Sequence, residues 1–208
     1  MGQLGQLTNT IALTMGVSWA SGINLYAAIL TLGILGSTGN LELPPDLAIL
    51  NNPVVMIAAA LMFAVEFVAD KIPGVDTLWD SVHTFIRIPA GALLAAGAVG
   101  DLNPALELAA ALMGGTIAAG SHATKAGSRI MINTSPEPVT NWIASLSEDL
   151  AVIVGLWVAL KHPVLFLVLF VAFIAFAIWL LPKIWQGIKK IFGFMGRLFG
   201  KTKTLPER

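Results

Sequence analysis

The sequence predicts an all-α integral membrane protein with about six transmembrane helices, and three observations support this fold class. Hydrophobic residues occupy 56% of the 208 positions. Charged residues occupy only 12%, whereas a soluble globular domain carries about 25%. The mean hydropathy is +0.81. A chain with this balance exposes most of its surface to lipid rather than to water.

The charge balance and the residue types exclude several function classes. Twelve Lys and Arg residues balance 12 Asp and Glu residues, and the zero net charge removes any general attraction to nucleic acid. The chain has no cysteine, which excludes disulfides, thiolate metal ligands and thiol catalysis. A Gly-rich phosphate loop, a His-Glu-x-x-His zinc helix and a Gly-x-Ser-x-Gly elbow are absent. We therefore expect no enzyme activity and no cofactor, and the sequence leaves a metal site open.

The predicted transmembrane domain, residues 1–181, contains six stretches near the roughly 20 mainly apolar residues that a membrane-spanning helix requires. They are residues 8–35, 53–68, 76–100, 104–129, 135–160 and 163–181. The second stretch has Pro53 in its first turn, and in the fourth and fifth a proline follows the cap residues Asn103 and Ser135. Pro89 predicts a kink within the third stretch.

The first and last stretches differ in character. The first has a polar middle, from Ser18 to Asn24, which is too polar for a helix that faces lipid along its whole length. The last, residues 163–181, contains no charged residue and predicts a lipid-facing anchor.

A basic tail, residues 182–208, follows the last stretch. It contains seven of the 12 basic residues, and the positive-inside rule therefore predicts that it is cytoplasmic. With six spans, the N-terminus is then cytoplasmic as well. Apolar residues among the lysines predict an amphipathic helix on the anionic inner leaflet. The alternative is a tail that only fixes the topology.

A weak internal repeat relates the first two spans to the fourth and fifth. At an offset of 98 positions, the matched pairs are Met15 with Met113, Gly16 with Gly114, Gly22 with Gly120, and Asn24 with His122. Three crossings separate the copies, which predicts an inverted-topology repeat of residues 8–71 and 104–160, joined by residues 76–100. Transporters of this plan bind substrate near the midplane beside interrupted helices. Gly22 and Gly120 are the predicted interruptions.

Charged and polar residues recur at helical spacing on the predicted spans. Steps of three or four residues place acids together on the second and fifth spans, bases together on the fourth, and both signs on the third. Ionisable groups inside a bilayer need partners or water, and they mark ion and substrate pathways. The candidate binding residues are Ser21, Asn24, Glu66, Asp70, Asp80, His83, Arg87, Ser121, His122, Lys125, Arg129, Asn141, Ser145, Glu148 and Asp149.

A purely structural interpretation competes with the functional one. Acidic and basic stripes on different spans can neutralise each other in the bundle interior. We favour function, because buried ion pairs stabilise proteins poorly and apolar packing would usually serve as well. Lys71 and Asp76 are instead predicted to form a turn and a helix cap. His83 and His122 are either core histidines or proton carriers.

Several segments resemble the bacterial integral membrane proteins grouped as domain of unknown function 4126, over roughly residues 10–160. They are Ala20-Ser21-Gly22-Ile23-Asn24-Leu25-Tyr26, Glu66-Phe67-Val68-Ala69-Asp70-Lys71-Ile72-Pro73-Gly74-Val75-Asp76, Trp79-Asp80, His83-Thr84-Phe85-Ile86-Arg87, and Ser121-His122 with the residues up to Arg129. The resemblance implies a multi-pass protein of the bacterial inner membrane and no particular activity.

A second similarity is to cation-proton exchangers whose inverted repeats carry Glu-x-Gly-Asp-Lys. In this chain Glu66 and Asp70 are one residue further apart, the glycine is replaced, and the acids at Glu148 and Asp149 have no lysine after them.

These observations lead to three expected functions. The first is a small secondary transporter or channel-like carrier for an ion or small polar solute, coupled to protons in one version. The second is translocation or binding of an anionic lipid or lipid-linked phosphate by Arg87, Lys125 and Arg129. The third is a non-catalytic membrane scaffold. The expected partners are membrane lipids, the transported species and a second copy of the chain in a homo-oligomer, and no nucleic acid.

Overall fold

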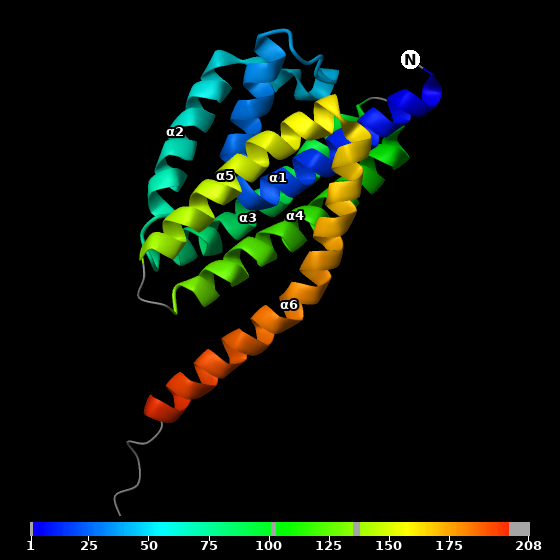
Figure 1. Ribbon diagram of the computed structural model, residues 1–208. Helices are drawn as coiled ribbons and strands as arrows, with labels where there is room; N and C mark the ends of the chain where they lie inside the picture. Colours follow the sequence, from blue (N-terminus) through cyan, green and yellow to red (C-terminus); the bar gives the residue numbers. More distant parts are fainter. Residues whose placement is uncertain (1, 101–102, 135–137, 200–208) are drawn as a thin grey trace, which may run out of the picture.

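The computed structural model describes residues 2–100, 103–134 and 138–199, and these residues form helices and turns with no strand. The elements are α1 (Gln3–Ser37), the short 3₁₀ helix η1 (Pro45–Asn51), α2 (Pro53–Ala69), α3 (Val75–Val99), α4 (Pro104–Ile132), α5 (Pro138–Lys161) and α6 (Pro163–Phe199), as Figure 1 shows. The all-α fold class is confirmed. The predicted start at residues 135–137 and the end of the tail at residues 200–208 lie outside the described residues.

Four described helices are long and apolar enough to cross a membrane: α1, α3, α5 and α6. The pair η1 and α2, bent by 67° at its break, makes a fifth candidate. The helix α4 is not among them, because its second half carries Lys125 and Arg129 among other polar residues. Several helices long and apolar enough to span a membrane are therefore present, as expected of a membrane protein. The helix α4 exposes Leu106, Leu108 and Leu112 in its first half and buries Lys125 and Arg129 in its second half.

Two asparagine caps followed by prolines begin α2 and α4. Oδ1 of Asn52 accepts the N–H of Val54 at 2.9 Å, and Oδ1 of Asn103 accepts the N–H of Ala105 at 2.8 Å. The cap predicted at Asn103 is thereby confirmed. The helix α3 continues as one helix through Pro89.

The helix α1 does not cross the bundle. Asn24 has an extended backbone (φ −148°, ψ 97°) that interrupts the helix. Asn9, before the break, lines the same cavity as Leu41 and Glu42, which follow the end of α1. Figure 1 shows the two halves meeting at mid-bundle and both reaching the same end. Residues 8–35, predicted as one straight crossing, thus form a helix pair that turns back within the bundle, and the break falls two residues after Gly22.

This return changes the topology. The chain reaches α2 at the end of the bundle where it began, and we call this the N-terminal end. At the opposite end, Ile184 and Gly187 of α6 contact the last turns of α4 at Gly127 and Met131. The start of α1 and the last described turns of α6 lie at opposite ends of the bundle (Figure 1), whereas the sequence predicts both termini on one side of the membrane. The helix α6 continues through Pro182 to Phe199, so the basic tail begins as an extension of the last span.

The inverted relationship between the repeat copies is also not found. Met15 and Met113 line one cavity, and further along both helices Gly22 lies against Ala118 and Ser121. The first half of α1 and α4 thus run side by side in the same direction. The prediction counted a crossing that α1 does not make. In addition, α4 is one continuous helix through Gly120, so the predicted interruption at Gly120 is wrong.

Small residues position α3 and α4 against each other and against α1. A Cβ added at Gly91 would lie 2.5 Å from Cβ of Ala118, and one added at Gly114 would overlap Cβ of Ala95. Such contacts allow close backbone approach along the whole helix pair. The first half of α1 packs on this pair, while α2 and α5 lie outside it (Figure 1). Acids on or next to α2 and α5 form ion pairs with bases of α3 and α4.

Candidate functional site

Four helices contribute charged side chains to the interior of the bundle, and the signs are segregated. The helices α3 and α4 supply the bases Arg87, Lys125 and Arg129. The helices α2 and α5 supply acids, and α3 adds one more acid. We call the seven residues joined by ion pairs the charge cluster: Glu66, Asp70, Asp80, Arg87, Lys125, Arg129 and Glu148.

The first section of the charge cluster surrounds the guanidinium of Arg87. Its Nη2 donates to Oε1 of Glu66 at 2.5 Å, and its Nη1 donates to Oδ1 of Asp80 at 3.0 Å. All three side chains are at most 2% exposed. Asp80 and Arg87 lie seven residues apart, two turns along one helix face, while Glu66 reaches them from α2.

Lys125 links this section to the next. Its Nζ lies 3.2 Å from Oε1 of Glu66 and 2.8 Å from Oδ2 of Asp70. It is also 3.7 Å from Oδ1 of Asp80 and 3.7 Å from Oε2 of Glu148. One buried ammonium therefore faces all four carboxylates of the charge cluster.

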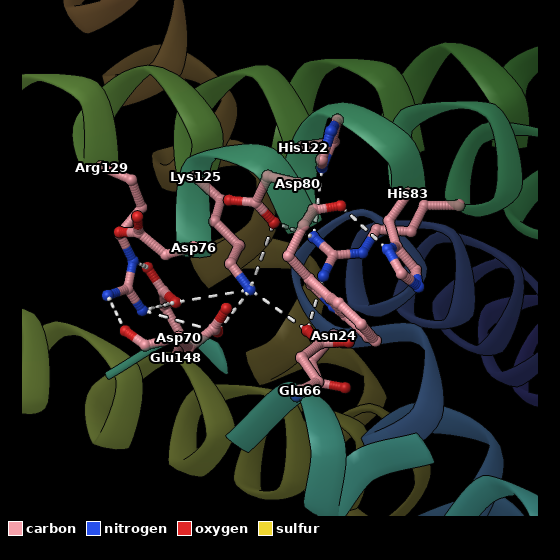
Figure 2. Close-up of polar contacts among 12 residues, drawn as sticks. Asn24, Glu66, Asp70, Asp76, Asp80, His83, His122, Lys125, Arg129 and Glu148 are labelled. Carbon is pink, nitrogen blue, oxygen red and sulfur yellow. Dashed lines mark hydrogen bonds and ion pairs between the residues drawn. The ribbon is translucent and has the colours of Figure 1, made fainter. Parts of the chain in front are cut away.

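Arg129 is the third cation of the charge cluster, after Arg87 and Lys125. It lies toward the end of the bundle opposite the N-terminal end. It holds Glu148 in a bidentate pair, with Nε at 3.2 Å from Oε1 and Nη2 at 2.6 Å from Oε2. Its Nη1 donates to the backbone carbonyls of Asp70 at 2.9 Å and Asn141 at 3.1 Å. Figure 2 shows the resulting row of cations with carboxylates between them.

The break in α1 lies beside the charge cluster. Oδ1 of Asn24 accepts the N–H of Ala27 at 2.9 Å and so caps the returning half of the helix. Its Nδ2 donates to Oδ1 of Asp149 on α5 at 2.8 Å. The carbonyl of Gly22, freed by the break, lies 3.5 Å from Nη1 of Arg87. Irregular backbone at this depth is therefore satisfied by protein groups, as a membrane interior requires.

Both ring nitrogens of each buried histidine have a partner. Arg87 can only donate, so Nδ1 of His122, 3.2 Å from Nη1 of Arg87, accepts. The proton then lies on Nε2, which donates to Oγ1 of Thr84 at 2.7 Å. Nδ1 of His83 donates to the carbonyl of Trp79 at 2.8 Å, and its Nε2 lies 3.0 Å from the hydroxyl of Tyr26. Between the two interpretations of these histidines, this geometry favours satisfied core residues.

The remaining candidate residues surround the charge cluster. Oγ of Ser21 donates to the carbonyl of Arg87 at 2.8 Å, and Oγ of Ser145 accepts from Nζ of Lys71 at 3.2 Å. Nδ2 of Asn141 donates to Oδ1 of Asn133 at 2.8 Å. The hydroxyl of Ser121 bonds carbonyls of its own helix, which places it beside the break rather than in the charge cluster.

The turn between α2 and α3 is more deeply buried than its sequence indicates. Asp76 is fully buried at the start of α3, where it accepts the N–H groups of Gly74 at 2.9 Å and Thr77 at 2.6 Å. Lys71 is only 8% exposed, with Nζ on the ring face of Phe67. Burial lowers the pKa of Lys71 below its ordinary value, although the carboxylates of Asp149 and Asp70 oppose that shift.

Sequence reasoning missed three contacting side chains. Tyr26 follows the break by two residues and bonds His83. Thr84 bonds His122, and Asn133 bonds the carboxylate of Asp76 at 2.8 Å. Tyr26 and Thr84 lie inside the family-like segments, so their position in those segments was the available signal.

The comparisons with known proteins identify the family. The model of the domain of unknown function family DUF4126 matches residues 11–183. The chain belongs to this family, which confirms the resemblance seen in the sequence. No curated protein and no solved structure matches the chain.

Among the described residues, no group of three or more His, Asp or Glu side chains is arranged to hold a metal ion. The chemistry that the described site offers is charge: three cations and four carboxylates, several of which share partners at distances of less than 4 Å.

Proposed function

We propose that this protein is a small secondary transporter or channel-like carrier for an ion or small polar solute. The observation that carries the proposal is the charge cluster, in which charged side chains from four helices meet in the buried interior of the bundle. Ionisable groups at bilayer depth cost roughly 2.5 to 3.5 kcal/mol each on insertion scales and are typical of ion and substrate pathways. Apolar packing in the same space would stabilise the bundle at least as well.

The broken helix supports the same function. Carriers place discontinuous helices beside their binding sites, because the freed backbone groups and helix ends supply polarity at mid-depth. Here the break at Asn24 lies next to Arg87 through the carbonyl of Gly22 and next to α5 through Asp149. The proposal therefore locates the binding site between α1, α2 and the charge cluster.

The proposal includes an orientation. The basic tail places the last turns of α6 in the cytoplasm of a bacterial inner-membrane protein. The turns at residues 70–74 and 133–134, together with Lys71 and Arg129, then lie near the cytoplasmic face. The start of α1 lies near the outer face, and α1 returns to that face after its break.

Lipid handling receives less support from the geometry. Arg87, Lys125 and Arg129 are at most 4% exposed and already contact carboxylates. A headgroup phosphate would have to displace those partners. We therefore retain lipid handling and a scaffold role only as outcomes of the test below.

The test is current recording on a solid-supported membrane with the purified full chain in liposomes. Steps in pH, in alkali cations and in small anions are applied to wild type, to Glu66→Gln and to Glu107→Gln. Glu107 is an exposed acid on α4 outside the charge cluster, so its change is a matched control. We expect a solute-dependent current in wild type and in Glu107→Gln, and at least a tenfold loss in Glu66→Gln.

A current that Glu66→Gln leaves unchanged would contradict the role of the charge cluster. If no variant gives a current, tracer uptake distinguishes electroneutral exchange from no transport. The absence of uptake from correctly inserted protein would refute the proposed function and favour lipid handling or a scaffold role.

A further inference from the structure

The signs of charge in the charge cluster do not balance. Four carboxylates face three cations. Two other buried acids lie nearby. Asp76 binds backbone N–H groups at the start of α3. Asp149 bonds Asn24 through Oδ1 and interacts with Lys71, while its Oδ2 has no hydrogen-bond partner among the described residues. If every acid in the charge cluster were ionised, the cluster would keep one uncompensated negative charge inside the bundle. An uncompensated buried charge is strongly unfavourable.

Unpaired atoms indicate where the missing positive charge belongs. Oε2 of Glu66, Oδ1 of Asp70, Oδ2 of Asp80 and Oδ2 of Asp149 are all buried and have no hydrogen-bond partner among the described residues. Glu66 and Asp80 share the same two cations. Each places one oxygen near Arg87 and Lys125 and leaves its other oxygen unpaired. Two carboxylates that share a site favour keeping one proton between them, because like charges at short range oppose ionisation of both.

We propose that the charge cluster binds one exchangeable proton, held on Glu66 or Asp80, and that this proton is the coupling ion of the proposed transporter. The role of this proton as the coupling ion rests on the proposed function, whereas the proton site itself does not. Binding forms one O–H bond on an unpaired carboxylate oxygen and changes the net charge of the cluster from −1 to 0. Release breaks that bond and returns the proton to water.

A proton fits this site better than a metal cation. A metal ion needs several oxygens directed at one point, and the described residues hold no such group. A proton needs a single oxygen. The charged and titratable groups that face Glu66 and Asp80 from the surrounding helices are Tyr26 on α1, Asp70 at the end of α2, His83 and Arg87 on α3, His122, Lys125 and Arg129 on α4, and Glu148 and Asp149 on α5.

The exposure of the four acids indicates the route. The side chain of Glu148 is 19% exposed, whereas those of Glu66, Asp70 and Asp80 are at most 2% exposed. Lys125 contacts both Glu148 and Glu66. A proton from water enters at Glu148. Lys125 then donates one ammonium proton to Glu66, which breaks an N–H bond and forms an O–H bond, and takes up the proton from Glu148, so that Lys125 ends as an ammonium again. Exchange occurs at the end of the bundle that bears Arg129.

Infrared spectroscopy tests the proton directly and does not depend on transport. The purified full chain is measured at pH 7 in a detergent without ester groups, in H₂O and in D₂O. Exposed Asp and Glu have ordinary pKa values of about 4 and are ionised at this pH. A carboxylic acid C=O band that shifts in D₂O therefore reports a buried protonated acid. We expect such a band in wild type and in Glu107→Gln, with an intensity of about one group per chain.

The variants Glu66→Gln and Asp80→Asn locate the proton. We expect the band to be lost in at least one of them, with far-ultraviolet circular dichroism showing that the variant is folded. Absence of the band in folded wild type, or a band unchanged in both variants, would overturn the inference. A band without transport would leave the proton assignment and refute the proposed function. A current carried by another ion, without the band, would support the proposed function and refute the proton assignment.

Discussion

Glu66 on α2 and Lys125 on α4 are joined by an ion pair of 3.2 Å although their helices share little direct packing. The C-terminal end of α2 is held to the bundle by Glu66 and by Asp70 and Lys71, which follow the helix. Their partners come from α3, α4 and α5. Ion pairs rather than apolar contacts thus join α2 and α5 to the pair formed by α3 and α4. A change in protonation acts directly on this connection.

Removing the central guanidinium tests that connection. We expect Arg87→Met to lower the free energy of unfolding by about 3 to 5 kcal/mol, because Glu66 and Asp80 lose their shared partner while buried. The double variant Arg87→Met with Glu66→Gln should lose less than the sum of the single changes. Reversible denaturant unfolding in detergent measures both. Additive effects would show that the two side chains are not coupled.

The break in α1 depends on Asn24. Substitution by alanine removes the cap on Ala27 and the donor to Asp149. Loss of an N-cap costs about 0.5 to 2 kcal/mol, so thermal unfolding should occur at a lower temperature. Asn24→Asp keeps a capping oxygen but sets a carboxylate against Asp149, and we expect it to recover stability only at low pH. Equal melting temperatures of Asn24→Ala and wild type would contradict this role.

Gly22 and Gly120 form a matched pair of variants. A Cβ at Gly22 would overlap the side chain of Ser121 and the backbone carbonyl of Ala118, whereas one at Gly120 meets nothing within 4 Å. We expect Gly22→Ala to cost about 1 to 3 kcal/mol. Gly120→Ala should be neutral or stabilise α4 by up to about 1 kcal/mol. Melting curves of the two variants measured side by side decide this, and the opposite order would refute the packing described for α1 and α4.

The re-entrant path of α1 is testable because the chain has no native cysteine. Single cysteines at Gln3, Asn40 and Thr134 occupy exposed positions. A membrane-impermeant maleimide applied from one side should label Gln3→Cys and Asn40→Cys together and Thr134→Cys only from the other side. Labelling of positions 3 and 40 from opposite sides would show that α1 crosses the membrane.

Local sequence predicted the elements well where a local cause exists. The cap at Asn103 and the proline at Pro53 begin helices where expected, because capping and the missing proline N–H act within one turn. The spacing of Glu66 with Asp70 and of Asp80 with Arg87 placed each pair on one helix face. The same reasoning missed Asn133 and undervalued Lys71 and Asp76, because their burial comes from segments far away in the chain.

Gly22 and Gly120 show where local reasoning ends. Each is followed two residues later by a polar side chain, and both were predicted to interrupt a helix. Only α1 breaks there. Asn24 finds a capping target in Ala27 and a carboxylate partner in Asp149, whereas the corresponding His122 bonds Thr84 from a regular helix. The difference lies in the partners supplied by α3 and α5.

The amino-acid sequence by itself determined that this protein is helical, belongs in a membrane and carries segregated acidic and basic helix faces, since composition and helical periodicity are local properties. The tertiary structure alone decided that α1 turns back, that the ends of the described helices lie on opposite sides, and that four carboxylates share three cations. Direction and partner choice depend on which distant side chains satisfy a buried polar group, and no spacing within one helix specifies them.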